Sequence, residues 1–253
     1  RRVLFRSSMT AVPGQLTGVS GGFAARGGVL TINFGGVSSQ VVLNTGSARF
    51  GDNFVFGSTE ADNRVVVVNP LALGNATRTF TVNTGVGGDL AELQGVISSS
   101  TSTDGLVKAG PGLLILSANN TYTGGTTINN GTLQLGNGGT TGAINNTSGI
   151  TNNATLAFNR SNSLTVAVGI SGSGVVNQIG TGTTSLSGGN SYVGGTNVNS
   201  GIITFLNTNA RPVSGTTTVA AGATLGLGVA SSGAFFNTAD VDNLFAGTLA
   251  NVT

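Results

Sequence analysis

The chain has 253 residues, of which 7% are charged, 38% are hydrophobic and 43 are glycine, and it contains no cysteine, histidine or tryptophan. The absence of cysteine excludes a disulfide framework, thiol catalysis and thiolate metal sites. The absence of histidine removes the commonest general base and a common metal ligand. The rest is rich in Gly, Ser, Thr and Asn and divides into short apolar runs, which predicts strands joined by tight turns and almost no helix.

Residues 1–7, RRVLFRS, match the translation of a common short-read sequencing adapter, so we exclude them from fold reasoning as an artefact. The alternative is a genuine basic stub. Without its three arginines, Lys+Arg falls from 10 to 7 against 8 Asp+Glu, and the net charge changes from +2 to −1. Nucleic-acid binding then lacks the clustered basic residues that phosphate contacts need. We expect residues 8–253 to form one continuous unit cut from a longer protein.

Short runs of alternating polarity predict strands along the whole chain. In the N-terminal part they are residues 29–34, 53–56, 64–70 and 77–82. The sequence number of similar positions rises by 22 from Ile32 to Phe54, by 19 from Leu114 to Leu133, by 23 from Thr132 to Thr155 and by 22 from Ile203 to Leu225. Steps of this size are typical of solenoids, in which each coil covers the apolar side and unpaired edges of its neighbour.

An internal repeat supports the same architecture. Residues 110–137 read GPGLLILSANNTYTGGTTINNGTLQLGN and residues 180–207 read GTGTTSLSGGNSYVGGTNVNSGIITFLN, at a constant offset of 70. We place the two copies at 105–137 and 175–207, and interpret the offset as about three coils with equivalent residues stacked rung over rung. Residues 93–98 resemble 168–171 at an offset of 73 (170 − 97), which places extra residues of the first copy between 98 and 104.

The shared positions are predicted to be structural. Two glycine pairs, 124–125 and 194–195, predict a turn between strands, and Gly131 and Gly201 predict the next corner. Asparagines at 120/190, 129/199 and 137/207 are expected at corners, where Asn tolerates a left-handed conformation. The predicted structural positions are Gly110, Gly112, Leu116, Ser117, Asn120, Tyr122, Gly124, Gly125, Thr126, Gly131, Gly180, Gly182, Leu186, Ser187, Asn190, Tyr192, Gly194, Gly195, Thr196 and Gly201.

Tyr122 and Tyr192 are the only two tyrosines and occupy equivalent positions. In a structural interpretation each ring caps a turn and covers apolar surface at the coil edge. In a functional interpretation they form an exposed aromatic ladder that stacks on sugars. The flanking turn-forming residues favour the structural interpretation.

Three segments of the first copy carry a family resemblance. They are Leu106-Val107-Lys108-Ala109-Gly110-Pro111-Gly112 through Leu116-Ser117, then Asn120-Thr121-Tyr122-Thr123-Gly124-Gly125-Thr126-Thr127-Ile128, and Gly131-Thr132-Leu133-Gln134-Leu135. This pattern resembles the autotransporter-associated β-strand repeat, also called the passenger-associated transport repeat. The second copy departs from it with Gln178 in place of Lys108 and with Ile202-Ile203 in place of Thr132-Leu133.

The resemblance implies an all-β fold, a right-handed parallel β-helix with coils of about 19 to about 25 residues, in the range of solenoid repeats. It also implies a bacterial passenger that is surface-exposed, associated with the outer membrane, or secreted. The implied partners are flanking passenger coils and a downstream outer-membrane translocator barrel, and members of the family are thought to assist passenger export.

The few acidic residues offer two candidate sites. Asp240 and Asp242 form a close pair that is either a calcium loop or a solvated terminal turn or strand face. Asp89 and Glu92 lie in a Gly-rich stretch, where they are either paired acids of a glycosidase or charges that solvate a loop. For both pairs we favour the interpretation as solvated surface charges. We therefore assign no catalytic, cofactor-binding or metal-binding residue.

Three functions are compatible with these features. The first is a non-enzymatic β-helical stalk that assists export and display of a passenger. The second is an adhesin or a surface that binds host or environmental glycans. The third is an enzyme of the polysaccharide-lyase or hydrolase kind. It has the least support, because such enzymes need acidic and basic residues close together and this chain has few of either.

Overall fold

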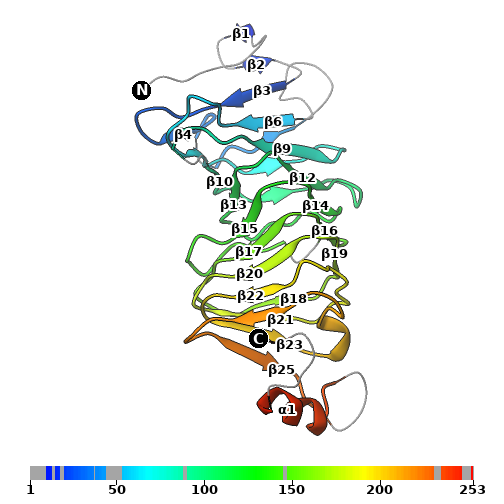
Figure 1. Cartoon of the computed structure of the whole chain (residues 1–253). Coiled ribbons are helices and arrows are strands. Elements are labelled where there is room, and N and C mark those ends of the chain that lie inside the picture. Colours follow the sequence, from blue (N-terminus) through cyan, green and yellow to red (C-terminus); the bar gives the residue numbers. More distant parts are fainter. Residues whose placement is uncertain are drawn as a thin grey trace.

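The computed structural model describes residues 10–12, 15–17, 20–36, 38–43, 53–87, 90–144, 147–230, 235–246 and 252. These residues form a β-solenoid, in which short strands wind around one core and coils follow each other from the top to the bottom of Figure 1. Residues 1–7, which match the adapter, lie outside the described residues.

Each coil has three sides, and strands of one side pair in parallel from coil to coil. The first side is a seven-stranded sheet made of β3 (Ser20–Phe23), β6 (Asn53–Phe56), β9 (Arg78–Val82), β12 (Leu106–Ala109), β14 (Thr126–Ile128), β16 (Ile150–Asn152) and β19 (Ile170–Ser171). The second side is a nine-stranded sheet made of β4 (Leu30–Ile32), β7 (Val65–Val67), β10 (Leu90–Leu93), β13 (Leu113–Leu116), β15 (Thr132–Leu135), β17 (Thr155–Phe158), β20 (Val175–Gln178), β22 (Thr196–Val198) and β24 (Thr217–Val219).

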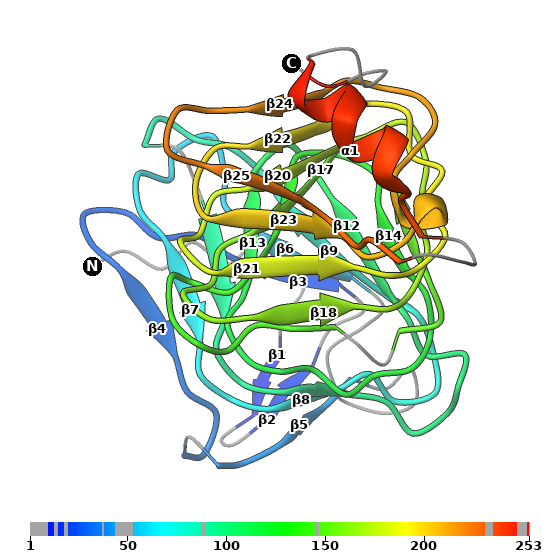
Figure 2. The ribbon, with the colours of Figure 1, turned by 90° about the horizontal axis from the view of Figure 1, so that it is seen from below.

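The third side contains two shorter sheets. One is made of β5 (Val41–Val42), β8 (Leu71–Ala72) and β11 (Ile97–Ser98), and the other of β18 (Leu164–Val166), β21 (Thr183–Leu186), β23 (Ile202–Phe205) and β25 (Thr224–Leu227). Between these sheets the backbone hydrogen bonds continue, from Thr121 N to Ile97 O at 2.8 Å and from Asn120 N to Ala143 O at 2.8 Å. Seen from below, strands and loops form a ring around the core (Figure 2). An antiparallel pair, β1 (Thr10–Val12) and β2 (Gln15–Thr17), precedes the first coil.

The coil lengths confirm most of the predicted steps. Leu114 pairs with Leu133, Thr132 with Thr155 and Ile203 with Leu225, which are the pairs expected from the apolar pattern. The predicted step from Ile32 to Phe54 is wrong, because β4 belongs to the second side and β6 to the first. Leu30 of β4 pairs with Val65 instead, so this early coil is longer than the others and contains loops that the apolar pattern did not reveal.

The core consists of inward side chains stacked in columns. Leu93, Leu116, Leu135 and Phe158 are paired in register on the second side and are at most 1% exposed. On the first side Phe54 and Phe80 stack with ring centroids 5.7 Å apart. Because every coil contributes to the same columns, burial of about 25 cal/mol per Å² of apolar surface stabilises neighbouring coils together rather than singly.

The two repeat copies lie on different sides of the solenoid. Strands β12, β13, β14 and β15 of the first copy lie on the first, second, first and second sides, whereas their equivalents β20, β21, β22 and β23 lie on the second, third, second and third sides. Leu106 reaches Ile170 on its own side after three coils, through Thr126 and Ile150, so three coils raise the sequence number by 64 (170 − 106).

The constant offset of 70 between the copies therefore spans three coils plus one side. A rise of 64 residues over three coils is about 21 residues per coil and about seven residues per side. An offset of 70 residues therefore makes about ten sides, which is three full coils of three sides and one side more. The expectation that equivalent residues of the copies stack rung over rung is wrong for this reason. Each copy keeps its local structure and is turned by one side relative to the other.

Helical structure is confined to the C-terminal part of the described residues. A 3₁₀ turn, η1 (Thr208–Ala210), follows β23, and one α-helix, α1 (Thr238–Phe245), lies below β25 (Figure 1). The helix begins with a capping box between Asn237 and Asp240, which satisfies two backbone N–H groups at its start. Within the described residues, no helix has the length and apolar character that a membrane span requires.

Candidate functional site

The two tyrosines fill equivalent corners of the solenoid. Both side chains are 0% exposed, and the Tyr122 hydroxyl lies 2.7 Å from the Thr126 hydroxyl, as that of Tyr192 lies 2.6 Å from Thr196. Burial, partly opposed by these hydrogen bonds, raises the pKa of Tyr122 well above 10 and that of Tyr192 to about 12. Since neither ring has a face open to solvent, the tyrosines cannot stack on sugars.

Asn120 and Asn190 act as internal braces rather than as left-handed corners. Asn120 Oδ1 accepts from Ile97 N at 2.8 Å, and its Nδ2 donates to the carbonyls of Ala118 and Ala143 at 2.9 and 3.1 Å, so one side chain links three successive coils. Asn190 accepts from Ile170 N at 2.9 Å and donates to Ala210 O in the same way.

The predicted left-handed asparagines are wrong, because among non-glycine residues of the described part only Asn75 has a positive φ. The left-handed positions belong to glycines. Gly131 and Gly201 have φ of +67° and +60°, and a Cβ on either would come within 2.6 Å of a carbonyl oxygen of the preceding coil. Gly124 and Gly194 have no positive φ, yet a Cβ there would lie within 2.5 Å of the neighbouring coil's backbone. Close approach of coils, as much as turn geometry, requires glycine here.

Lys108 and Gln178 perform the same task at equivalent positions. Lys108 is fully buried, and its Nζ donates to the carbonyls of Ala109, Gly110 and Asn130 at 2.9, 2.7 and 3.0 Å. Gln178 Nε2 donates to Gly180 O, the equivalent of Gly110 O, at 2.8 Å. Burial lowers the pKa of Lys108 to about 8. The departure of the second copy from the family pattern at this position thus preserves the corner hydrogen bond.

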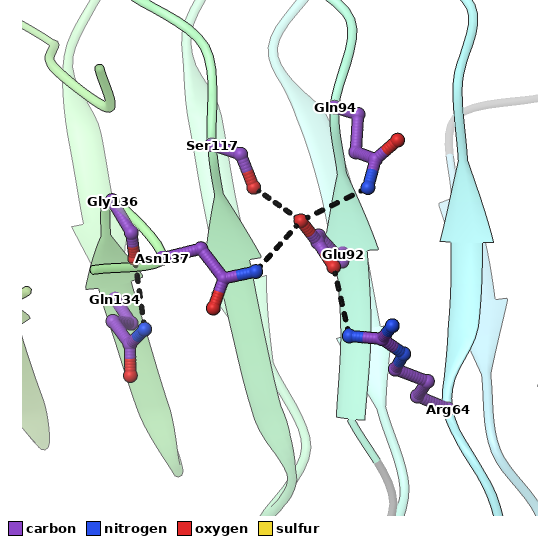
Figure 3. Close-up of polar contacts among 7 residues, drawn as sticks. All are labelled: Arg64, Glu92, Gln94, Ser117, Gln134, Gly136 and Asn137. Carbon is purple, nitrogen blue, oxygen red and sulfur yellow. Dashed lines mark hydrogen bonds and ion pairs between the residues drawn. The ribbon is translucent and has the colours of Figure 1, made fainter. Parts of the chain in front are cut away.

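Glu92 forms a buried polar clamp on the outward face of the second side (Figure 3). The side chain lies on β10 and is 2% exposed. One carboxylate oxygen accepts from Ser117 Oγ at 2.6 Å, Asn137 Nδ2 at 3.1 Å and Gln94 Nε2 at 3.2 Å. The other lies 3.3 Å from Arg64 Nη1. The clamp joins β10 to the corner after β13 and to the loop at 136–142.

A second buried charge holds the other end of that loop. Arg160 is 7% exposed and donates to the carbonyls of Thr140 and Gly142 at 2.5 and 3.1 Å, and to Asn162 Oδ1 at 2.9 Å. Burial lowers the pKa of Arg160 from its ordinary value. The loop is therefore tied down at both ends by charged side chains that do not face solvent.

Asp104 organises the loop that distinguishes the first copy from the second. Its carboxylate accepts from the backbone N–H groups of Asn75, Ser100 and Thr101 at 3.1–3.2 Å and from the Thr101 hydroxyl at 2.5 Å. Burial raises its pKa, but these hydrogen bonds outweigh burial and the net pKa is lowered. Residues 99–105 separate β11 from β12, whereas only residues 172–174 separate β19 from β20, so the loop that Asp104 organises is the longer one.

The structure describes three of the four acidic residues that the sequence offered as candidate sites. Asp240 and Asp242 lie on α1, so the expected turn or strand face is wrong, and Asp240 accepts from Asn237 N at 2.9 Å in the helix cap. Glu92 lies in a buried strand rather than in a solvated loop, and Asp89 is outside the described residues. Among the residues that the structure describes, His, Cys, Asp and Glu form no group of three or more that could hold a metal ion.

Sequence reasoning missed the buried charges, although one signal was present. Lys108 alternates with apolar positions in LVKA, at the phase that points inward in β12, and Arg78 takes the same phase in β9. A charged residue at an inward position of a strand predicts burial with hydrogen-bond partners. No comparable signal existed for Glu92, whose outward position is covered by a loop two coils further along.

Comparison with known proteins identifies the repeats. Residues 106–135 and 176–205 match the family described as Passenger-associated-transport-repeat. Over 104 residues the chain is 38% identical to "Adhesin BmaC autotransporter" of Brucella suis biovar 1 (strain 1330), a match that covers 41% of this chain and 3% of that protein. No solved structure matches the chain. The chain thus carries two passenger-associated transport repeats and is distantly homologous to an autotransporter adhesin over part of its length.

Proposed function

We propose that this chain is a non-enzymatic structural segment, a β-helical stalk of an autotransporter-type passenger that assists export and displays other segments at the bacterial surface. Its partners in this role are the flanking passenger coils and a translocator domain of the complete protein. The two repeat matches and the distant homology to an autotransporter adhesin support this proposal.

The position of the shared residues carries the proposal. Leucine, tyrosine, asparagine and threonine positions common to both copies are buried in the core or at the corners, at Leu116/186, Tyr122/192, Asn120/190 and Thr126/196. The copies are also turned by one side, so equivalent outward residues point in different directions. A repeat selected for ligand binding would present its shared residues on one face, whereas these residues build coils.

The hydrogen-bond pattern suits progressive folding during export. Asn120 ties its own coil to the coils before and after it. Lys108 bonds within its own corner and to Asn130 of the next coil, and Gln178 bonds within its own corner. Solenoids gain stability from nearest-neighbour contacts, so a coil can fold as soon as its predecessor is in place.

Export of the complete passenger tests this role. Gly131→Val together with Gly201→Val would place side chains against backbone of the preceding coil, and Gly139→Val, at a position with open space, is the matched control. We expect the double variant to reduce the amount of passenger that added protease can reach on cells, while the control leaves it unchanged. Normal surface amounts of a double variant that is destabilised when purified would contradict the export role.

An adhesin or glycan-binding role is the second candidate, because the matched relative is named an adhesin. Binding of the purified chain to a glycan array or to host cells would support it. Failure to bind across broad panels would leave the stalk role alone. Turnover of pectin-like or other polysaccharides in the presence of calcium would contradict the non-enzymatic assignment; the buried acids Glu92 and Asp104 are already occupied by structural hydrogen bonds.

A further inference from the structure

The sequence contains two Asn-Gly pairs, Asn130-Gly131 and Asn137-Gly138, seven residues apart (137 − 130). An asparagine followed by glycine is prone to deamidation, because glycine has no Cβ to hinder attack of its backbone nitrogen on the asparagine side chain. The reaction needs a side-chain amide that can rotate and a backbone N–H that can release its proton. Hydrogen bonds to either group oppose it, so the contacts of each pair decide whether that pair reacts.

The pair at 137–138 is held at both groups. Asn137 Nδ2 donates to the Glu92 carboxylate at 3.1 Å (Figure 3), and Gly138 N donates to Asn159 O at 2.9 Å. The carboxylate beside Asn137 also opposes the negative charge that develops on the peptide during attack. This pair is therefore protected in the folded chain.

The pair at 130–131 is open to attack. Asn130 is exposed at the corner between β14 and β15, and Gly131 is partly exposed. Within the part of the chain that the structure describes, neither the Asn130 side chain nor the Gly131 N–H has a hydrogen-bond partner. The carbonyl oxygen of the same peptide accepts from Lys108 Nζ at 3.0 Å. Because Lys108 is fully buried, its ammonium group acts on this oxygen with little screening by water.

We propose that Asn130 is a site of self-catalysed deamidation, and that Lys108 promotes the reaction through the Asn130 carbonyl oxygen. Loss of the Gly131 N–H proton to water places negative charge on that oxygen, where the ammonium group stabilises it. The nitrogen then bonds to Asn130 Cγ, the bond from Cγ to Nδ2 breaks, and ammonia leaves with a proton taken from water. The product is a cyclic imide that contains the Asn130 α-carbonyl carbon, Cγ and Gly131 N.

Lys108 also directs how the imide opens. Water adds to one of the two carbonyl carbons and breaks the bond from that carbon to Gly131 N. Addition to the α-carbonyl carbon puts the transient negative charge on the oxygen that Lys108 contacts, so this route is favoured. It leaves Gly131 N bonded to Cγ and turns the α-carbonyl into a carboxylate, which makes the product isoaspartate. The hydrogen bond from Lys108 to a neutral carbonyl then becomes a stronger bond between two charged groups.

The second copy lacks both parts of this arrangement. Ser200 precedes Gly201 at the equivalent corner, so this corner has no side-chain amide for the backbone nitrogen to attack. Gln178 takes the place of Lys108, and its neutral amide donates to Gly180 O at 2.8 Å. Ser200→Asn therefore reproduces an Asn-Gly corner without an ammonium group beside it, within the same molecule.

Mass spectrometry of the whole purified chain, incubated folded at neutral pH, tests the proposal. We expect Asn130 to deamidate at least about tenfold faster than Asn137, with isoaspartate as the main product. The two rates should converge when the chain is incubated in urea, which removes the contacts that distinguish the pairs. Fragmentation of the peptide backbone distinguishes isoaspartate from aspartate. Equal rates at the two pairs in the folded chain would overturn the proposal.

Two variants separate the lysine from the corner. Lys108→Gln keeps a donor but removes the positive charge, so deamidation at Asn130 should slow at least about tenfold and the isoaspartate fraction should fall to that of the unfolded chain. In Ser200→Asn, the introduced pair should react at least about tenfold more slowly than Asn130. A folded Lys108→Gln chain with the wild-type rate and product ratio, or an introduced pair as fast as Asn130, would overturn the proposal. Neither readout depends on export, so its failure would leave the stalk role standing.

Discussion

Buried polar side chains close the corners of this solenoid by donating to backbone carbonyls. Lys108 and Gln178 do so at equivalent positions, and Asn120 and Asn190 do so one side further along. A carbonyl left without a partner inside the protein costs about 1–3 kcal/mol. The identity of the donor matters less than its presence, which explains why lysine and glutamine can exchange at this corner.

Substitution of Lys108 tests that explanation. Lys108→Gln should change the free energy of unfolding by less than about 1 kcal/mol, whereas Lys108→Met leaves three carbonyls without this donor and should lower it by about 1–3 kcal/mol. Urea unfolding at neutral pH measures both. Equal losses in the two variants would show that the charge of Lys108, rather than hydrogen bonding, supports the corner.

The same lysine predicts a pH dependence. Its pKa is about 8 when folded, against an ordinary value of 10.5, so between these values the unfolded chain holds a proton that the folded chain has released. The free energy of unfolding should therefore rise from pH 8 towards pH 10, and rise less in Lys108→Gln. Above pH 10 the two tyrosines act in the opposite direction, because their pKa values are raised in the folded state and that stability is lost as pH rises. Identical pH profiles of wild type and variant between pH 8 and 10 would contradict a buried lysine.

The tyrosine hydroxyls predict an asymmetry between the copies. Thr126 has a second partner, the Thr147 hydroxyl at 3.1 Å, in addition to Tyr122. Tyr122→Phe should therefore cost less than Tyr192→Phe, which removes the partner of the Thr196 hydroxyl; both losses should lie between about 0.5 and about 1.5 kcal/mol. Truncation of either ring to alanine should cost about 3–5 kcal/mol because it opens a cavity. Thermal or urea unfolding of the four variants would reveal a reversed order if the assignment is wrong.

At the scale of elements, strand pairing fixes how closely consecutive corners approach. Gly131→Ala and Gly201→Ala force a left-handed conformation on alanine and place its Cβ within 2.6 Å of carbonyl oxygens, so we expect a loss of at least about 2 kcal/mol for each. Gly139→Ala meets no atom within 4 Å and should be neutral within about 0.5 kcal/mol. A loss at Gly139 as large as at Gly131 would contradict the assignment of the cost to the left-handed conformation and close approach at the corner.

The Glu92 clamp predicts how the loop at 136–142 is held. Glu92→Gln replaces one acceptor oxygen with a donor, which would face either the Ser117 and Asn137 donors or Arg64. Because Asn137 then loses its hold on the loop, the backbone N–H of Gly138 should exchange with deuterium at least about tenfold faster. Glu60→Gln removes the exposed ion pair between Glu60 and Arg26, at 3.6 Å, and should leave that exchange unchanged. Equal exchange in both variants would show that Arg160 alone fixes the loop.

At the scale of the whole molecule, the sequence was sufficient for the solenoid and its coil length. Leu114, Leu133 and Leu156 form one column at the steps that the apolar pattern predicted, because parallel pairing puts inward residues of successive coils in register. The glycine corners at 131 and 201 were also predictable, since turn chemistry is local.

The angular relation of the copies and the buried charges could not be predicted. Tyr122 and Tyr192 have similar local sequences, yet their sides differ because the coils between them add up to a non-integral number of turns. That sum depends on every loop length between the copies. Glu92 is buried by Asn137, which lies 45 residues away, and no local pattern reports such a contact.

Paired spin labels test the rotation of the copies most directly. The chain lacks cysteine, so Val107→Cys can be combined in turn with Ser171→Cys, three strands further on the same side, and with Asn177→Cys, the equivalent position of the second copy. The first pair should give a backbone separation of about 14 Å, three strand spacings. We predict a clearly longer distance for the second pair, because β12 and β20 lie on different sides. Equal distances for both pairs would mean that the copies stack directly, and would contradict a repeat of three coils plus one side.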